Sequence, residues 1–124
     1  MNAFAAALLA SDPKDSLGLS LFGLWSTRMA LEETNKAPDA VIAAAAAWFA
    51  FAGPSISKFC QEEKSFDRKV AKPGSAFADH SWRGFNKERW AAWQDKFGTL
   101  EGQLSEPAAK ELVAEARKAM AESN

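Results

Sequence analysis

The chain has 124 residues, of which 48% are apolar and 25% charged, and its 15 basic side chains nearly balance its 16 acidic ones. This composition is typical of one soluble globular domain over residues 1–124, and a net charge of −1 gives little long-range attraction to a phosphate backbone. The single cysteine, Cys60, excludes an internal disulfide, and we therefore expect a reducing, cytoplasmic location.

Helix-forming residues dominate the sequence. Alanine supplies 26 of the 124 residues, tyrosine is absent, and the β-branched apolar residues are few. A chain of this length can bury roughly two thirds of its unfolded surface, which is enough for a core without metal or disulfide staples. We predict an all-α fold, a single compact bundle of five or six helices.

The first two predicted helices are strongly apolar. Asn2 can cap a short helix over residues 3–10, which lacks the basic start of a signal peptide. A long second helix begins at Asp15 or Ser16 and extends to about residue 35. Its large side chains form two neighbouring stripes, one of Leu17, Leu21, Leu24, Arg28 and Leu31 and the other of Phe22, Trp25 and Met29. Such a helix is expected to be buried on most sides.

A third helix is predicted over residues 39–52, with Gly53 as its left-handed terminator. A fourth, amphipathic helix opens at Pro54 and carries Cys60 on its apolar side, where a cysteine is usually inert. The uncharged run over residues 40–57 approaches the length of a membrane span. Because Gly53 and Pro54 break this run, the pattern favours a buried core helix.

Residues 65–85 lack helical periodicity and form a long predicted loop. Asn86 caps a fifth helix that Gly98 ends, and Ser105 caps a last helix over residues 106–121. The predicted core is centred on six aromatic side chains, namely Trp25, Trp48, Phe49, Trp90, Trp93 and Phe97.

The sequence lacks the motifs of the common metal and nucleotide sites. One histidine and one cysteine cannot supply a zinc site or a di-metal carboxylate bundle. The glycine-rich phosphate loops and the Gly-x-Ser-x-Gly elbow of hydrolases are also absent. We therefore predict no metal and no cofactor.

The densest group of polar and aromatic side chains spans residues 77–90. Asp79 beside His80 has the composition of a proton-transfer pair, although a surface loop with an inactive histidine is the simpler interpretation. Trp82, Arg83 and Arg89 are the candidate ligand-binding residues of this group.

Arg28 interrupts the most apolar helix of the chain. If its stripe faces the core, the guanidinium needs a carboxylate, and Glu32, one turn later, is the local candidate. The simpler alternative places Arg28 at the edge of the bundle, with its stem along apolar surface. A third possibility is that Arg28 anchors an anionic ligand.

Basic residues outnumber acidic ones by seven to three over residues 64–89, where aromatic residues are interleaved with them. This pattern occurs in proteins that bind single-stranded nucleic acid. The near-neutral charge of the whole chain argues against that function, and a solvated loop is the simpler interpretation.

Two segments resemble a known family. They read Asn2-Ala3-Phe4-Ala5-Ala6-Ala7-Leu8-Leu9, followed by a helix with Leu24-Trp25, and Glu88-Arg89-Trp90-Ala91-Ala92-Trp93-Gln94-Asp95-Lys96-Phe97-Gly98. Both are similar to a filamentous-fungal family of uncharacterised α-helical proteins, a domain of unknown function. The resemblance implies a chain truncated at the N-terminus, because a further helical region precedes these segments in the family. It supplies no catalytic residues.

A core face left open by that truncation must be covered by the chain itself, by a second copy or by another protein. We therefore predict a non-catalytic intracellular binding module, a homodimer that uses the apolar faces of its first two helices or a module for another protein partner.

Two alternatives stay open. One is a small cofactor-independent cyclase or isomerase of fungal secondary metabolism, in which His80 is the acid or base, Asp79 orients it, and an aromatic pocket holds an apolar or anionic ligand. An enclosed pocket of about 300 Å³ or more, with Arg28 or His80 facing inward, would favour this enzyme, and a solid interior would favour the binding module. The other alternative is a nucleic-acid adaptor that uses the basic segment.

Overall fold

The computed structural model describes residues 2–11, 15 and 18–123, and within them the fold is all-α, as predicted. Five α-helices and two short 3-10 helices follow one another along the chain: α1 (Asn2–Ala10), α2 (Leu19–Leu31), α3 (Asp39–Gln61), η1 (Lys69–Ala71), η2 (Ser75–Phe77), α4 (Lys87–Glu101) and α5 (Pro107–Ser123). In this part of the chain the only β pairing is an isolated bridge between Ser65 and Gly84.

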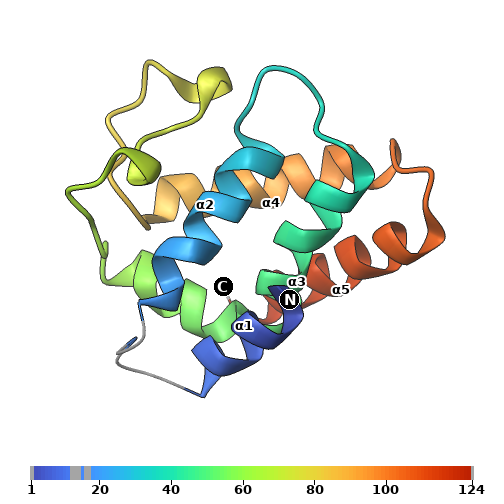
Figure 1. Cartoon of the computed structure of the whole chain (residues 1–124), viewed down its shortest axis with the longest axis horizontal. Helices are drawn as coiled ribbons and strands as arrows, with labels where there is room; N and C mark the ends of the chain where they lie inside the picture. The colour runs from blue at the N-terminus through green and yellow to red at the C-terminus, as the bar shows by residue number, and fades with distance from the viewer. Residues whose placement is uncertain (1, 12–14, 16–17, 124) are drawn as a thin grey trace.

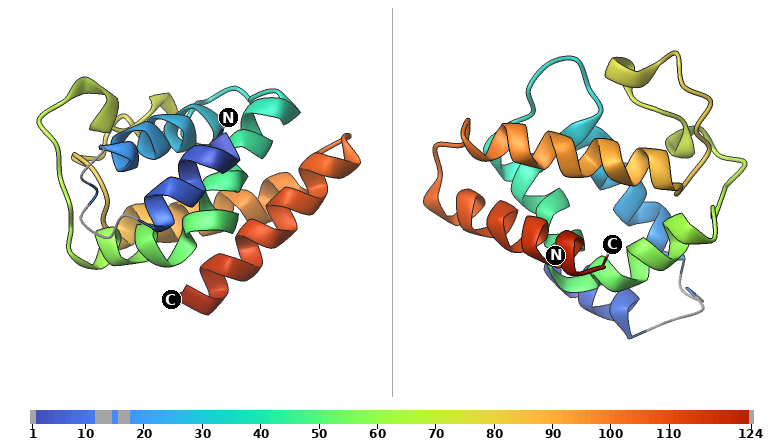
Figure 2. Two further views of the ribbon diagram at one scale, coloured as in Figure 1. Left: turned by 60° about the horizontal axis from the view of Figure 1, so that its bottom comes forward. Right: turned by 180° about the vertical axis from the view of Figure 1, so that it is seen from behind.

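Helix α3 is the centre of the fold. It lies between α1 and α2 on one side and α4 and α5 on the other, and it contacts all four (Figures 1 and 2). Trp48, Phe49 and Ile56 are buried along it. Of the described helices, α3 alone is long and apolar enough to cross a membrane, and 56% of its most apolar window is buried by the rest of the chain.

The structure has a kink next to the predicted break at Gly53, and the two predicted helices follow one another without a loop as the two halves of α3. The backbone bends at Ala52 (φ −134°, ψ 23°), close to Pro54, which has no amide hydrogen to donate to the carbonyl one helical turn before it. Gly53 is not left-handed. A side chain at Gly53 would come within 3.3 Å of the Ala119 Cβ, so this glycine lets α5 approach α3 closely.

Helix α2 is shorter than predicted at both ends. It begins after Gly18, which is left-handed (φ 68°), and the Asp15 carboxylate accepts hydrogen bonds from the amide and hydroxyl of Ser20. The alternative cap Ser16, and Leu17 of the first stripe, lie outside the described residues. The helix ends at Leu31 because Glu32 turns into the interior.

The expectation that Trp25 belongs to the core is wrong. Trp48, Phe49, Trp90, Trp93 and Phe97 are buried as predicted, whereas Trp25 is 43% exposed. Helix α2 packs on α3 through its small residues: a Cβ at Gly23 would lie only 2.9 Å from the Trp48 ring. Because the Trp48 indole fills the space between the helices, the small residues of α2 turn inward together with Leu24 and Leu31, and Phe22, Trp25 and Met29 turn outward.

The last two helices begin near the predicted positions. The Asn86 side chain caps α4 as predicted and accepts a hydrogen bond from the Arg89 amide at 2.7 Å. Gly98 does not end α4, which continues to Glu101 and buries Leu100 in its last turn. Helix α5 is capped from a distance, because Asp39 Oδ2 accepts hydrogen bonds from the amides of Ser105 (2.8 Å) and Glu106 (3.0 Å).

The cap formed by Asp39 makes the stability of the fold depend on pH. Hydrogen bonds from the Glu106 and Ser105 amides, with a further one from Lys36, hold the pKa of Asp39 below its ordinary value of 3.8. A carboxyl group whose pKa is lowered by folding stabilises the folded state fully when the pH is above its pKa in the unfolded chain. This stabilisation is lost as the pH falls through its lower pKa in the folded protein.

We therefore expect Asp39→Asn to lower the thermal unfolding midpoint at neutral pH, and we expect its deficit against the native chain to shrink near pH ~3. The matched control is Asp95→Asn, at an exposed carboxylate on α4. An equal difference in unfolding midpoint between Asp39→Asn and the native chain at neutral and at acidic pH would contradict this role of Asp39.

Residues 65–85 are not a structureless loop. They contain η1 and η2 and form a lobe beside α2 and α4 (Figure 1). Backbone hydrogen bonds join the two ends of this segment, from the Phe66 amide to the Arg83 carbonyl (2.7 Å) and from the Phe85 amide to the Lys64 carbonyl (2.8 Å). Ala71, Trp82 and Phe85 are buried, so the segment is packed against the core.

Candidate functional site

A buried ion pair fixes the 65–85 segment to the helices. The side chains of Glu32, at the end of α2, and Arg89, in the first turn of α4, are both fully buried. Arg89 Nε donates to Glu32 Oε2 at 2.7 Å, and Arg89 Nη2 donates to Glu32 Oε1 at 2.8 Å. This two-point geometry is the strongest form of an arginine–carboxylate contact.

The remaining hydrogen-bonding groups of the pair are also used. Trp93 Nε1 and the Gly74 amide donate to the Glu32 carboxylate at 2.7 and 3.0 Å. Arg89 also donates to three backbone carbonyls, those of Ala71, Lys72 and Gly84. The Glu32–Arg89 network, as we call these two residues with Trp93, therefore closes a polar centre inside an apolar core. In the described part of the chain every buried side-chain nitrogen and oxygen has a hydrogen-bond partner.

The predicted partner of Arg28 is wrong, since Glu32 pairs with Arg89. Arg28 lies half-buried at the edge of α2, where its Nη1 donates to the Lys69 carbonyl at 3.1 Å. This is the edge position that we gave as the simpler alternative. The correct pairing joins residues 57 positions apart, and the signal for it was the place of Arg89 one turn before Trp93 on the buried face of α4.

The structure brings several of the predicted site residues together in one aromatic group. The His80 ring contacts the Trp82 ring at a tilt of 40° (centroids 4.4 Å apart) and the Phe77 ring (5.5 Å), and its Nδ1 lies 3.1 Å from an Asp79 carboxylate oxygen. Arg89 lies over the Trp82 ring at 5.3 Å. Trp82 is buried and donates from Nε1 to Glu88 Oε1 at 2.6 Å.

The Asp79–His80 pair faces solvent on the carboxylate side, because the Asp79 side chain is 89% exposed. Arg83 is exposed and lines a surface cleft of about 510 Å³ that also includes Ser81, Trp82 and Lys87. Arg28 and His80 face the Lys69 carbonyl and the Trp82 ring. Neither Arg28 nor His80 lines any of the five clefts described in this structure, although Trp82 and Lys69 line two of them.

Helix α2, which was expected to be buried on most sides, carries an exposed apolar stripe. Phe22, Trp25 and Met29 are 43%, 43% and 40% exposed and follow one another at helical spacing. We call these three side chains the α2 surface. The edge of the Trp25 ring system contacts the Phe22 ring at 6.0 Å between centroids, and Phe22 also contacts the buried Trp48.

The α2 surface is a ridge between two hollows. On one side Phe22 and Trp25 line a cleft of about 400 Å³ with Arg68, Lys69 and Val70. On the other side the three ridge residues line a cleft of about 260 Å³ with Val41, Ala44 and neighbouring residues of α2 and α3.

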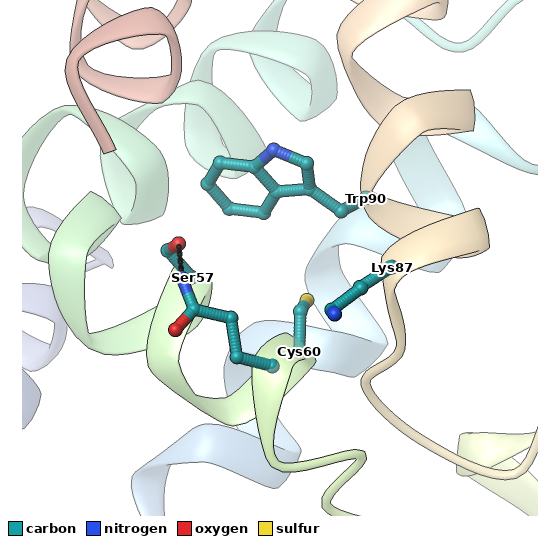
Figure 3. Close-up of a pocket in the computed structure, with 5 residues that line it drawn as sticks. Ser57, Cys60, Lys87 and Trp90 are labelled. Carbon is teal, nitrogen blue, oxygen red and sulfur yellow. Dashed lines mark hydrogen bonds between the residues drawn. The ribbon is translucent and has the colours of Figure 1, made fainter. Parts of the chain in front are cut away.

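A further cleft lies where the last turn of α3 meets the first turn of α4. It has a volume of about 410 Å³ and is lined by Ser57, Cys60, Gln61, Lys87 and Trp90. Figure 3 shows the Trp90 indole on one side of this hollow and Cys60 and Lys87 on the other. We call it the Cys60 cleft.

Comparison with known proteins gives one match. A family model described as "Protein of unknown function (DUF3632)" covers residues 1–97. The matched region includes α1, α2, α3, the 65–85 segment and most of α4, and thus both members of the buried ion pair. No curated protein and no solved structure matches the chain.

Proposed function

The chain belongs to this family of unknown function, and we propose that it is a non-catalytic helical binding module that pairs with a second copy of itself through the α2 surface. The observation that carries the proposal is the exposure of Phe22, Trp25 and Met29 on one stripe of a helix. Soluble domains seldom leave such a group of large apolar side chains in water without a use for it.

The chemistry of the stripe suits a protein interface. Aromatic residues and methionine are enriched at the centre of interfaces, and charged residues are depleted there. The three ridge side chains carry no charge, and the nearby cations Arg28, Arg68 and Lys69 lie beside the ridge. A contact between this ridge and the hollow shared by α2 and α3, which no charged residue lines, therefore buries no ion.

The shape of the surface favours a second copy as the partner. A two-fold pair requires one patch that is complementary to itself. The α2 surface has this property in outline, because a ridge and the hollows that can receive it lie on the same face. The ridge of one copy can thus enter the uncharged hollow between α2 and α3 of the other.

A charge in the middle of the ridge should separate the two copies. At micromolar concentration we expect the native chain to sediment as a dimer and Trp25→Glu to sediment as a monomer. Trp25 is 43% exposed, and in the described part of the chain its ring contacts only the ring of Phe22, so the variant should keep the native helical circular dichroism.

The matched control is Phe51→Glu, at a side chain on α3 that is 51% exposed and lies outside the α2 surface. This variant should stay dimeric. A native chain that is monomeric at tens of micromolar, or a pair that Phe51→Glu separates and Trp25→Glu does not, would overturn the proposal.

A further inference from the structure

The Cys60 cleft joins an apolar wall to a single cation. Its apolar wall is formed by the buried side chains of Trp90 and Cys60. Lys87 is the one charged residue among the five that line the cleft. It makes no ion pair with any residue that the structure describes.

The polar side chains of the cleft are already occupied by the protein. The Ser57 hydroxyl donates to the Ser123 carbonyl at 2.7 Å, and the Gln61 amide donates to the Ser57 hydroxyl oxygen at 3.2 Å. Burial raises the pKa of the Cys60 thiol to about 12, so the sulfur is neutral at physiological pH and does not act as a counter-ion for Lys87.

The position of the cleft adds to its positive potential. Lys87 is the first residue of α4, a helix of 15 residues whose amino end carries a partial positive charge. The acidic residue of this first turn, Glu88, is directed to Trp82 by the hydrogen bond from the indole. Lys87 thus lies between the Cys60 cleft and the neighbouring cleft that Arg83 lines, and its ammonium forms an ion pair with no described carboxylate in either.

We propose that the Cys60 cleft binds a small molecule that joins one anionic group to an apolar body, with the anion at Lys87 and the body against Trp90. The volume of about 410 Å³ lies in the range of ligand pockets. The site is distinct from the α2 surface, so it can fail without affecting the proposed pairing of copies, and the pairing can fail without affecting it.

A matched pair of probes tests the charge and the apolar body separately. 2-Naphthoate carries an anion on a flat ring system, and 2-naphthamide has the same ring system without the charge. In a nuclear magnetic resonance titration of the full chain, we expect 2-naphthoate to shift amide signals of the α3 end and α4 start, with a dissociation constant on the order of 1 mM. The neutral probe should bind about five-fold more weakly.

Variants of two exposed lysines then assign the preference. Lys87→Gln should bring the affinity for 2-naphthoate down to that for 2-naphthamide. Lys58→Gln changes an exposed lysine of α3 that does not line the cleft, and it should keep the preference of about five-fold for 2-naphthoate. Equal binding of the two probes to the native chain, an equal effect of both variants, or signal shifts confined to α2 would each overturn the proposal.

Discussion

Replacing Arg89 with methionine is expected to lower the free energy of unfolding by about 3–5 kcal/mol. The variant leaves the fully buried Glu32 carboxylate without its cation and removes the donors from three carbonyls. A domain of this kind has about 5–15 kcal/mol of stability in total, so the loss takes a large share of it. Urea unfolding followed by circular dichroism measures the difference.

The matched control is Arg83→Met, which removes an exposed arginine from the same region and should change stability by no more than about 0.5 kcal/mol. Arg89→Lys should also destabilise the protein, because one ammonium cannot reproduce the two-point contact with Glu32 together with the bonds to the carbonyls. An Arg89→Met variant within about 1 kcal/mol of the native chain would contradict this account.

A double variant separates the cost of an orphaned charge from the value of the pair. If most of the loss comes from the unpaired carboxylate, Glu32→Leu combined with Arg89→Met should cost less than the two single variants added together. Strict additivity would show that the two side chains act independently, which their distance of 2.7 Å makes unexpected.

The second large effect is expected for Gly74→Ala. A Cβ at Gly74 would lie 2.5 Å from the Glu32 carbonyl oxygen and 2.7 Å from the Glu32 Cβ. The backbone there cannot retreat easily, because the Gly74 and Ala76 amides both donate to Glu32. Relieving the overlap should therefore break these bonds and lower the free energy of unfolding by about 2–3 kcal/mol.

Gly102→Ala is the matched control. A Cβ at Gly102 would meet nothing within 4 Å, and its backbone has the ordinary right-handed conformation (φ −78°, ψ −8°). This variant should be neutral or more stable by up to about 1 kcal/mol. Limited proteolysis gives a second measurement, since Gly74→Ala should speed cleavage within residues 65–85. Equal stability of the two variants would show that the contact with Glu32 tolerates a side chain.

The helices could be predicted from the sequence because apolar residues recur with the helical period and Asn86 is a strong cap. The bounds depended on tertiary packing. Gly53 and Pro54 read locally as a break, and the structure has a kink there, at Ala52, but α3 resumes without a loop where Ala119 of α5 approaches Gly53 closely. Likewise α2 carries two apolar stripes, and only the position of Trp48 decides which of them faces inward.

The candidate sites were less predictable. Proximity along the chain suggested Glu32 as the partner of Arg28, whereas the structure pairs it with Arg89, and periodicity cannot rank contacts between distant segments. The residues 77–90 were identified as one group, and the structure does place His80 and Arg89 against the Trp82 ring. The Cys60 cleft depends on how three helix ends meet, which no local pattern encodes.

The separation of 57 residues between Glu32 and Arg89 also sets the order in which parts of the nascent chain can pack. Until α4 has left the ribosome, the carboxylate at the end of α2 has no cation to accompany it into an apolar interior. We expect the first half of the nascent chain to keep that acid in water and the lobe of residues 65–85 to stay unattached. Once Arg89 has been synthesised, we expect the Glu32 carboxylate to become buried and the segment of residues 65–85 to pack against the helices in one late step.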